Sequence, residues 1–340
     1  MARRRLSQQQ SRRVEQSQHR RSERRRSGDA STADGQLGPE AAGVVVAGYG
    51  HRLAVEDEQG RLHLCSSRQH LPLPVAGDRV LWQASGGGQG VIVAIEPRVS
   101  ELARLDRQGR PRALAANVNL VVVVCAPRPA LNEFLVDRYL VAVEDMGVEA
   151  LVILNKADLL EPEARADLLA RLESYRDLGY AQLITSKRSL EGIDALQRQL
   201  AGRTAVMVGQ SGVGKSSLVA TLLPDREVAV RAVSETTGFG THTTTNACLY
   251  HLPSGGSLID SPGVRGFEPT LTLEALDRGF RELLPLLGRC RFSDCSHTVE
   301  PGCRLQEAVS AGQVEARRYQ SFLQLREEIA GRTAPGGSPA

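Results

Sequence analysis

The sequence predicts a multidomain protein with a small N-terminal β-barrel, a central α/β domain built on a parallel sheet, and a C-terminal helical domain. Several short apolar segments separated by glycine turns lie between residues 43 and 95. From about residue 117 the pattern changes to a strand followed by a helix, repeated along the chain. Three cysteines and one histidine then cluster among predicted helices between residues 272 and 329. These three observations define the predicted fold class.

Charge is distributed unevenly along the 340-residue chain. Ten arginines and two glutamates within residues 1–26 give this segment a charge of +8, whereas the whole chain carries +3. Because the segment has almost no apolar side chains to bury, we expect residues 1–42 to be a disordered, arginine-rich tail and linker. Such an arm suits RNA phosphates. A merely solvated tail stays open, and a mitochondrial transit peptide is disfavoured because Leu6 and Val14 alone form no amphipathic face.

The sequence also bears on compartment and assembly. No run of about 18 apolar residues occurs, and the chain is charged from Arg3 onward, so neither a membrane span nor a secretory signal is predicted. Cys65, Cys125 and Cys248 are scattered and are expected to be reduced and buried. We therefore expect a cytoplasmic protein that does not associate with membranes. A monomer is expected, and the sequence itself leaves the oligomeric state open.

The first folded domain is expected over residues 43–103. Its five strands are predicted at 44–46, 52–56, 61–65, 75–82 and 90–95. Many short strands with frequent glycine turns are typical of a small closed barrel of the oligonucleotide-binding kind, the OB-fold. A barrel with only a packing role stays an alternative, because a fold does not determine a function.

The second domain is expected over residues 104–271. The continuous apolar run from residue 119 to residue 125 is typical of a strand that is buried on both faces of a sheet. Further strands are predicted at 149–154, 183–184, 205–208 and 256–259, and helices at 134–146, 162–175, 193–200 and from residue 215. Alternating strands and helices predict an α/β domain with a parallel sheet.

A glycine-rich loop lies between the strand at 205–208 and the next helix, as a phosphate-binding loop (P-loop) requires. Glycines let backbone N–H groups converge on phosphate oxygens, and the helix N-terminus adds partial positive charge. Lys215 is expected to reach the terminal phosphates and to act in catalysis, and Ser216 to ligate Mg²⁺. The nucleotide contacts predicted here are Gly209, Gln210, Ser211, Gly212, Val213, Gly214, Lys215, Ser216 and Ser217.

The loop after the strand at 149–154 favours guanine. It reads Asn155-Lys156-Ala157-Asp158. The Asp158 carboxylate can accept two hydrogen bonds from a guanine edge, whereas adenine lacks both donors and would leave the carboxylate unpaired. Asn155 can tie this loop to the P-loop, and the Lys156 stem can cover the face of the base.

A second loop supports the same base. It reads Thr185-Ser186-Lys187, and the Ser186 amide is expected to meet the guanine carbonyl. Only three of the 42 basic residues in the chain are lysine, and all three lie in these loops: Lys156, Lys187 and Lys215. A slim ammonium fits beside phosphates or a base where a bulky guanidinium does not.

The strand at 256–259 is followed by Asp260-Ser261-Pro262-Gly263. Asp260 is expected to hold Mg²⁺ through water, and the Gly263 amide to meet the γ-phosphate. The next residue is Val264, so no glutamine is available there to orient the attacking water.

A loop rich in glycine and threonine, residues 238–245, lies between the P-loop and Asp260. We favour Thr244 over Thr243 as a ligand of Mg²⁺, together with Ser216 and Asp260. His242 is the candidate that positions the water or stabilises the transition state. An exposed loop histidine with no such role stays an alternative.

The order of these motifs is unusual. A typical GTPase runs from the P-loop through a threonine switch and Asp-x-x-Gly to the two guanine loops. Here the guanine loops come first. The same sheet can form if the original chain ends are joined and the chain is opened at another loop, which is a circular permutation. The central domain is therefore predicted to be a circularly permuted P-loop GTPase domain.

The third domain is expected over residues 272–330, followed by a disordered end at 331–340. Its cluster offers three thiolates and one imidazole, from Cys290, Cys295, His297 and Cys303. A closed Cys₃His set is typical of one structural zinc ion, although an accidental cluster of buried thiols stays open. A basic face is expected around it from Arg289, Arg291 and Arg304.

These motifs together resemble the bacterial ribosome small-subunit-dependent GTPase A family. The resemblance rests on the permuted order, the P-loop, the run from Gly240 to Thr245 and the spacing of the cysteine cluster, and it covers roughly residues 43–325. It implies the three domains above, and binding to the 30S subunit and its rRNA during late maturation. The switch histidine of the family would fall on His242. Thr241, where a basic residue is expected, and Asn119, where aspartate is commoner, depart from the family pattern.

The predicted activity is hydrolysis of GTP to GDP and phosphate, with Mg²⁺ as the cofactor of the reaction. The family resemblance implies that the 30S subunit stimulates this hydrolysis. Without a glutamine, slow intrinsic turnover is expected. Two other classes stay open: a nucleotide-independent RNA-binding scaffold and a P-loop phosphotransferase. Guanine preference without a second substrate pocket disfavours the phosphotransferase.

Overall fold

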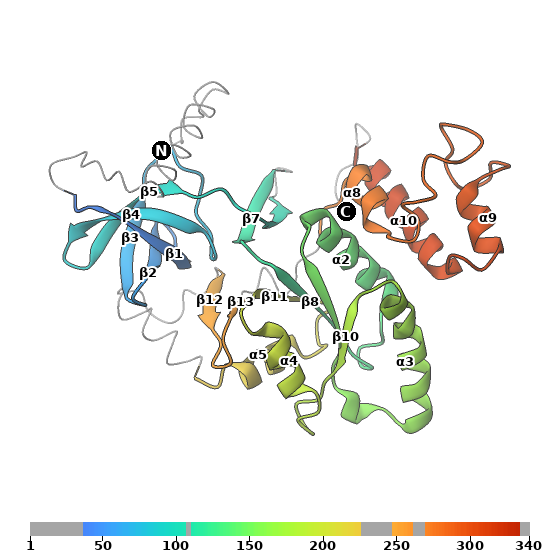
Figure 1. The fold of residues 1–340 in the computed structure, drawn as a ribbon, viewed down its shortest axis with the longest axis horizontal. Helices are drawn as coiled ribbons and strands as arrows, with labels where there is room; N and C mark the ends of the chain where they lie inside the picture. The colour runs from blue at the N-terminus through green and yellow to red at the C-terminus, as the bar shows by residue number, and fades with distance from the viewer. Residues whose placement is uncertain (1–36, 107–109, 226–246, 261–268, 334–340) are drawn as a thin grey trace.

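The computed structural model describes residues 37–106, 110–225, 247–260 and 269–333. Its elements form an N-terminal barrel, a central sheet flanked by helices and a C-terminal group of helices (Figure 1). This confirms the predicted fold class. The exact domain limits stay predictions.

The N-terminal barrel has OB-fold topology. Its strands are β1 (Glu40–Tyr49), β2 (Arg52–Asp57), β3 (Leu62–Ser67), β4 (Arg79–Gly86) and β5 (Gln89–Ile95). They are hydrogen-bonded in the order β1-β2-β3-β5-β4, and β1 also pairs with β4, which closes the barrel. Only β3 and β5 run parallel among these pairs. The barrel core gathers apolar side chains around Trp82 and Ile92.

Several strand limits in the barrel differ from the prediction, among them the starts of β1 and β4. Strand β1 begins at Glu40, where it pairs with Gln83, and thus includes three residues that were expected to belong to the linker. Strand β4 begins at Arg79 and not at residue 75, because Gly77 has a left-handed backbone (φ 91°) that turns the chain just before the strand. A Cβ atom on Gly77 would lie 2.1 Å from the Ala116 carbonyl oxygen, so the turn packs closely against the following domain.

The central sheet has the strand order β10-β9-β8-β11-β13-β12. The strands are β8 (Leu120–Cys125), β9 (Glu149–Leu154), β10 (Ala181–Ile184), β11 (Thr204–Val208), β12 (Cys248–His251) and β13 (Ser257–Asp260). All neighbours run parallel except β12, which is antiparallel to β13. Every residue of β8 is buried, as its continuous apolar run predicts.

Helices connect these strands. They are α2 (Glu133–Met146), the short η1 (Ala157–Leu159), α3 (Pro162–Asp177), α4 (Ile193–Leu200) and α5 (Lys215–Leu222). The predicted binding loops follow the carboxyl ends of β9, β10, β11 and β13. Parallel strands bring these ends to one edge of the sheet, where ligands bind in open α/β folds. Loops far apart in the sequence therefore share one site.

Two features were not predicted. Strands β6 (Glu101–Leu105) and β7 (Pro111–Ala116) form a hairpin between the barrel and the central sheet, and the predicted limit at residue 103 falls inside β6. These segments contain arginines and small alanines with little alternation, so the strand pattern is weak. Strand β12 is only four residues long and also lacks a clear pattern.

The barrel and the central sheet are joined edge to edge. Strand β1 pairs with β12 through Ala47 and Cys248. Beside this contact, the His251 ring atom Nε2 lies 2.6 Å from the Glu56 carboxylate. Within the barrel, Arg98 stabilises the turn before β4, because its guanidinium donates hydrogen bonds of 2.8 Å to both carboxylate oxygens of the buried Asp78.

The pair of His251 and Glu56 should make stability depend on pH. The hydrogen bond to Glu56 raises the pKa of His251 above its ordinary 6.5, despite partial burial. A raised folded-state pKa stabilises the folded protein fully below pH 6.5, and this contribution is lost as pH rises through the raised value. The histidine side chain is 61% exposed, so we expect only about 0.2–1 kcal/mol.

Thermal unfolding of Glu56→Gln and the parent protein from about pH 5.5 to about pH 9 measures this effect. The Tm difference should be largest at the acidic end and vanish at the alkaline end. Glu58→Gln in the neighbouring turn is the control for loss of a surface charge. An equal difference at every pH would contradict the assignment.

The C-terminal region contains α8 (Leu273–Gly279), α9 (Arg304–Ser310) and α10 (Ala316–Thr333). Helix α10 extends past residue 330, where the third domain was expected to end. Residues 280–303 consist mainly of turns that carry the cysteine cluster. In the part of the chain that the structure describes, no helix is long and apolar enough to cross a membrane.

Candidate nucleotide-binding site and zinc centre

The P-loop connects β11 to α5. Its glycines Gly209, Gly212 and Gly214 have φ values of 137°, 84° and 99°, in the region that favours glycine. A Cβ atom on Gly209 would lie 2.1 Å from the Val124 carbonyl oxygen, and one on Gly214 would lie 2.4 Å from Asn155 Nδ2. The turn therefore favours glycine at all three positions, and the close approach of neighbouring segments also requires glycine at positions 209 and 214.

Lys215 is buried at the start of α5, inside the P-loop. Its Nζ atom donates to the Gly209 carbonyl at 2.6 Å and to the Gln210 carbonyl at 2.9 Å. Ser216 and Ser217 follow on the exposed side of the helix. Asp260, the buried last residue of β13, lies on the strand next to β11. The predicted phosphate and Mg²⁺ residues among the described ones thus lie at the same sheet edge.

Asn155 connects three loops. It is buried, and its Nδ2 atom donates to the Val213 carbonyl of the P-loop at 2.9 Å. Its Oδ1 atom accepts a hydrogen bond of 3.1 Å from the Thr185 hydroxyl. The link between Asn155 and the P-loop that the sequence suggests is present in the structure. The hydrogen bond from Thr185 was not foreseen.

Lys156 lies across the P-loop. Its Nζ atom donates to the Gly212 carbonyl at 2.5 Å and to the Arg128 carbonyl at 2.9 Å. Its backbone is left-handed, with φ 60°. The contact with Arg128 brings in a segment that the sequence analysis did not single out, the loop after β8. A signal was present, since two prolines flank Arg128 directly after a fully buried strand.

The guanine-facing loops hold the Asp158 carboxylate in place. The Ser186 hydroxyl donates to Asp158 at 2.5 Å and accepts from the amides of Arg188 and Ser189 at 3.2 Å each. The Ser186 amide, which was expected to meet a guanine carbonyl, instead donates to the Glu191 carbonyl at 3.0 Å. In this structure it is therefore directed into its own loop. Ala157 is buried beneath the loop, while Asp158 and Lys187 are exposed.

Asp158→Asn should separate guanine recognition from phosphate binding. An asparagine replaces one acceptor oxygen with a donor, so two charge-assisted hydrogen bonds of about 1.5–3 kcal/mol each are lost. We expect GTP binding to weaken about 10²- to 10⁴-fold. Binding of xanthosine triphosphate should recover, since xanthine presents an acceptor where guanine has its amino group. Calorimetry of both nucleotides measures this, with the exposed Asp167→Asn on α3 as control. Unchanged GTP affinity would exclude Asp158 from base recognition.

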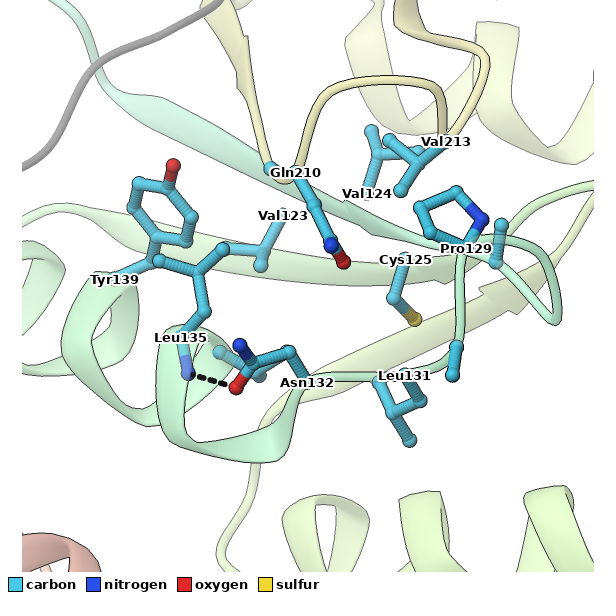
Figure 2. A pocket seen from close by; sticks show the side chains of 14 residues that line it. Val123, Val124, Cys125, Pro129, Leu131, Asn132, Leu135, Tyr139, Gln210 and Val213 are labelled. Atoms are coloured by element: carbon cyan, nitrogen blue, oxygen red, sulfur yellow. Dashed lines mark hydrogen bonds between the residues drawn. The ribbon is translucent and has the colours of Figure 1, made fainter.

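A small cavity lies between the P-loop and the start of α2 (Figure 2). The Gln210 side chain points into it from above, toward Asn132 and Leu135. The Asn132 side chain accepts a hydrogen bond of 3.0 Å from the Leu135 amide and caps the helix. The first turn of α2 is therefore packed directly beneath the P-loop.

Three predicted residues cannot be placed. His242, Thr244 and Gly263 lie outside the residues that the structure describes. Their proposed roles in catalysis, Mg²⁺ binding and γ-phosphate binding stay predictions.

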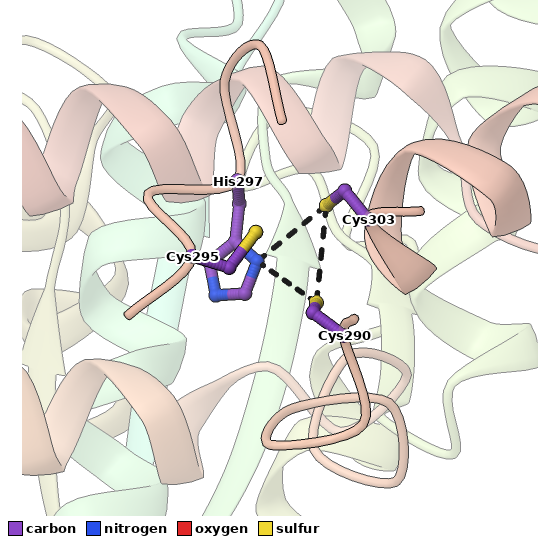
Figure 3. A group of neighbouring side chains, drawn as sticks. All are labelled: Cys290, Cys295, His297 and Cys303. Carbon is purple, nitrogen blue, oxygen red and sulfur yellow. Dashed lines mark hydrogen bonds between the residues drawn. The ribbon is translucent and has the colours of Figure 1, made fainter. Parts of the chain in front are cut away.

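The predicted metal ligands come together in the C-terminal region (Figure 3). Their donor atoms all lie within 4.8 Å of one another. His297 Nδ1 is 3.5 Å from the Cys290 sulfur and 3.6 Å from the Cys303 sulfur, and these two sulfurs are 4.0 Å apart. Tetrahedral zinc requires about 3.5 Å between nitrogen and sulfur and about 3.8 Å between sulfurs, so the donors fit zinc. The zinc would cross-link the turns and leave no ligand position for catalysis.

Side chains of helices α9 and α10 donate hydrogen bonds to the backbone of the turn that carries His297. The Tyr319 hydroxyl and the Gln306 amide both donate to the His297 carbonyl. Arg326 donates to the Ser296 carbonyl at 3.1 Å. These hydrogen bonds hold His297 in a left-handed backbone conformation, with φ 65°. The other three cysteines are free and buried, as expected. Arg289, Arg291 and Arg304 are exposed, and Arg304 pairs with Glu307 at 2.7 Å. The basic face around the cluster stays a prediction.

The interlocked loops at the carboxyl edge of a permuted parallel sheet define a circularly permuted P-loop GTPase. Comparison with known proteins agrees. The family model described as RsgA GTPase matches residues 95–270. The small ribosomal subunit biogenesis GTPases RsgA of Ectopseudomonas mendocina and Azotobacter vinelandii are 45% and 47% identical over 334 residues, which cover 96% of this chain and 97% of each relative.

Solved structures are also similar. The crystal structure of YjeQ from Thermotoga maritima has a TM-score of 0.69 and 31% identity, and covers 86% of this chain and 99% of its own. The structure of YloQ, a circularly permuted GTPase, has a TM-score of 0.67 and 26% identity, and covers 89% and 99%. The chain belongs to the RsgA GTPase family, as the resemblance in its motifs implied. It is a GTP hydrolase.

Proposed function

We propose that this GTPase binds the small (30S) ribosomal subunit, acts in its late maturation, and hydrolyses GTP to GDP and phosphate with stimulation by the subunit. The curated relatives are named small ribosomal subunit biogenesis GTPases, which supports the biological role. The observation that carries the activity is the interlocking of Asn155, Lys156 and Thr185 with the P-loop, since it assembles both guanine loops beside a phosphate cradle.

In the proposed complex, the Asp158 carboxylate accepts from the guanine edge and the Lys156 stem covers the base. The P-loop amides and the Lys215 ammonium bind the β- and γ-phosphates. Ser216, Thr244 and Asp260 would hold Mg²⁺, which supplies positive charge to the phosphates when bound. Lysine fits this place because a compact ammonium reaches between two carbonyls where a guanidinium would not.

The reaction is an in-line attack of water on the γ-phosphate, in which Lys215 and backbone amides stabilise the charge that develops. His242 is proposed to position the water, because Val264 stands where a glutamine would act in a typical GTPase. A site without that glutamine should turn over slowly alone. This is the physical reason to expect stimulation by a partner.

The proposed partner is ribosomal RNA within the 30S subunit. We propose that the protein binds it in the cytoplasm and as a monomer. The arginine-rich residues 1–26 and the exposed arginines Arg289, Arg291 and Arg304 provide positive charge for phosphates. The OB-fold barrel belongs to a class that binds oligonucleotides. One zinc ion would stabilise the C-terminal region that carries part of this charge.

Turnover of GTP and ATP with and without purified 30S particles tests the proposal. We expect hydrolysis of GTP but not ATP, and a rise of roughly 10-fold or more when the subunit is added. Nucleotide-independent binding to 30S particles, with no effect on turnover, would favour the RNA-binding scaffold. Transfer of phosphate to a second small molecule would favour the phosphotransferase. Either result would overturn the proposal.

A further inference from the structure

Helix α2 is shared between two hydrophobic cores. Residues 136–143 are buried without interruption, which is unusual for a helix on the surface of a sheet. Tyr139 and Leu140 belong to the core beneath the central sheet. Val141 and Ala142 belong to the core of the C-terminal helices, together with the zinc ligands Cys295 and Cys303. Figure 1 shows α2 between the sheet and the C-terminal helices.

A buried ionic cluster lies at this contact, centred on Asp137 of α2. The Asp137 carboxylate accepts hydrogen bonds from Tyr175 of α3 at 2.7 Å, from Arg318 at 2.7 Å and from Arg317 at 2.9 Å. Both arginines belong to α10. Asp137 is 0% exposed and Arg318 is 1% exposed. One carboxylate on the GTPase domain therefore anchors two consecutive arginines of the last helix.

Arg318 is held from several sides. The Glu282 carboxylate accepts hydrogen bonds from Arg318 Nε at 2.7 Å and from Arg318 Nη2 at 3.1 Å. The Arg318 guanidinium also lies 4.4 Å from the centre of the Phe280 ring. Burial lowers the pKa of Arg318, but Glu282 and Asp137 together raise it above its usual value, so the guanidinium stays charged. Removing Asp137 would leave buried positive charge with fewer partners, which loosens a helix strongly.

The residue that follows Arg318 supports the metal ligands. Tyr319 donates its hydroxyl to the His297 carbonyl, and Arg326, two turns further along α10, donates to the Ser296 carbonyl. One side of α10 is thus fixed to α2 by ionic hydrogen bonds, while a neighbouring side fixes the backbone of a zinc ligand. A shift of α10 on α2 would move the support of His297.

We propose that Asp137 is a positioning residue for the zinc centre, which couples zinc binding in the C-terminal region to the docking of α10 on the GTPase domain. The inference rests on the proposed zinc centre and does not depend on the proposed ribosomal role. Coupling of this kind is reciprocal: what loosens the docking weakens zinc binding, and loss of zinc loosens the docking.

Zinc affinity of the full-length protein, measured by competition with a chromophoric chelator, tests the first direction. Partners beyond the ligands typically change metal affinity about 10- to 100-fold, so we expect Asp137→Asn and Tyr319→Phe each to weaken zinc binding about 10-fold. Asp145→Asn is the matched control, because Asp145 lies on the same helix and pairs with Arg278 at an exposed position. It should retain the affinity of the parent.

Hydrogen exchange tests the reverse direction. Removal of zinc from the parent should increase amide exchange across α2, and Asp137→Asn should do so with zinc still bound. If Asp137→Asn does not fold, Arg318→Lys replaces it, since lysine keeps the charge but cannot span Asp137 and Glu282. Parental zinc affinity in Asp137→Asn, or in Arg318→Lys where it takes the place of Asp137→Asn, would overturn the proposal. So would unchanged exchange across α2 after zinc removal.

Discussion

Lys215→Ala is expected to lower the turnover of GTP by about 10²- to 10³-fold or more, as removal of one group that stabilises the transition state does in other enzymes. The Lys215 ammonium lies inside the P-loop, within hydrogen-bond distance of the Gly209 and Gln210 carbonyls. The terminal phosphates of a nucleotide would lie at this point. Alanine removes the only described lysine in the loop and leaves the negative charge of the γ-phosphate less compensated in the transition state.

Single-turnover and steady-state kinetics with GTP measure this prediction. Thr221→Ala on the same helix is the control, because the Thr221 hydroxyl donates to the Ser217 carbonyl within α5 at 2.9 Å. Lys215→Arg tests shape against charge, and we expect it to fail as well, since a planar guanidinium is too broad for the space between the two carbonyls. A parental kcat in Lys215→Ala would show that the lysine does not act on the reaction.

Loss of zinc is expected to unfold the C-terminal region while the barrel and the GTPase domain stay folded. The region has three described helices, two of them seven residues long, and its core includes the sulfurs of Cys295 and Cys303. Structural zinc contributes about 10–16 kcal/mol of apparent binding free energy in small domains. This is as large as the whole stability of a typical domain, about 5–15 kcal/mol, so little structure should persist without it.

Cys303→Ser tests this expectation, with Cys248→Ala as the control for a buried thiol outside the cluster. Elemental analysis should find one zinc per chain in the parent and the control, and much less in Cys303→Ser. Hydrogen exchange should rise across residues 290–310, while Trp82, the single tryptophan of the chain, reports an intact barrel by its fluorescence. Full zinc content and parental exchange in Cys303→Ser would contradict a structural zinc centre.

Several parts of the fold were predictable because their signals are local. The buried run of β8, the alternation of strands and helices, and the glycines of the P-loop each depend on a few consecutive residues. The β6–β7 hairpin was not predictable, because its strands carry arginine and alanine where a strand pattern requires alternating apolar residues. The start of β4 also differed, since a single left-handed glycine decides where that strand begins.

The candidate site also has features that the sequence predicts and features that only the structure shows. The spacing of Gly209, Lys215 and Asp260 relative to predicted strands placed them at one sheet edge, because parallel strands end there. The hydrogen bond from Lys156 to the Arg128 carbonyl and the turning of the Ser186 amide toward Glu191 depend on how separate loops meet. Contacts between loops that are distant in the sequence leave no pattern in consecutive residues, so they could not be predicted.

By itself, the sequence determined the kinds of chemistry in this protein: a phosphate loop, a carboxylate for guanine, and three thiolates with one imidazole. Those signals are short, and backbone geometry over a few residues defines them. Only the tertiary structure decided that α2 lies in two cores and that Asp137 anchors α10 beside the zinc ligands. Contacts between residues some 180 positions apart depend on how helices pack across domains, and side-chain packing of that kind has no local period in the sequence.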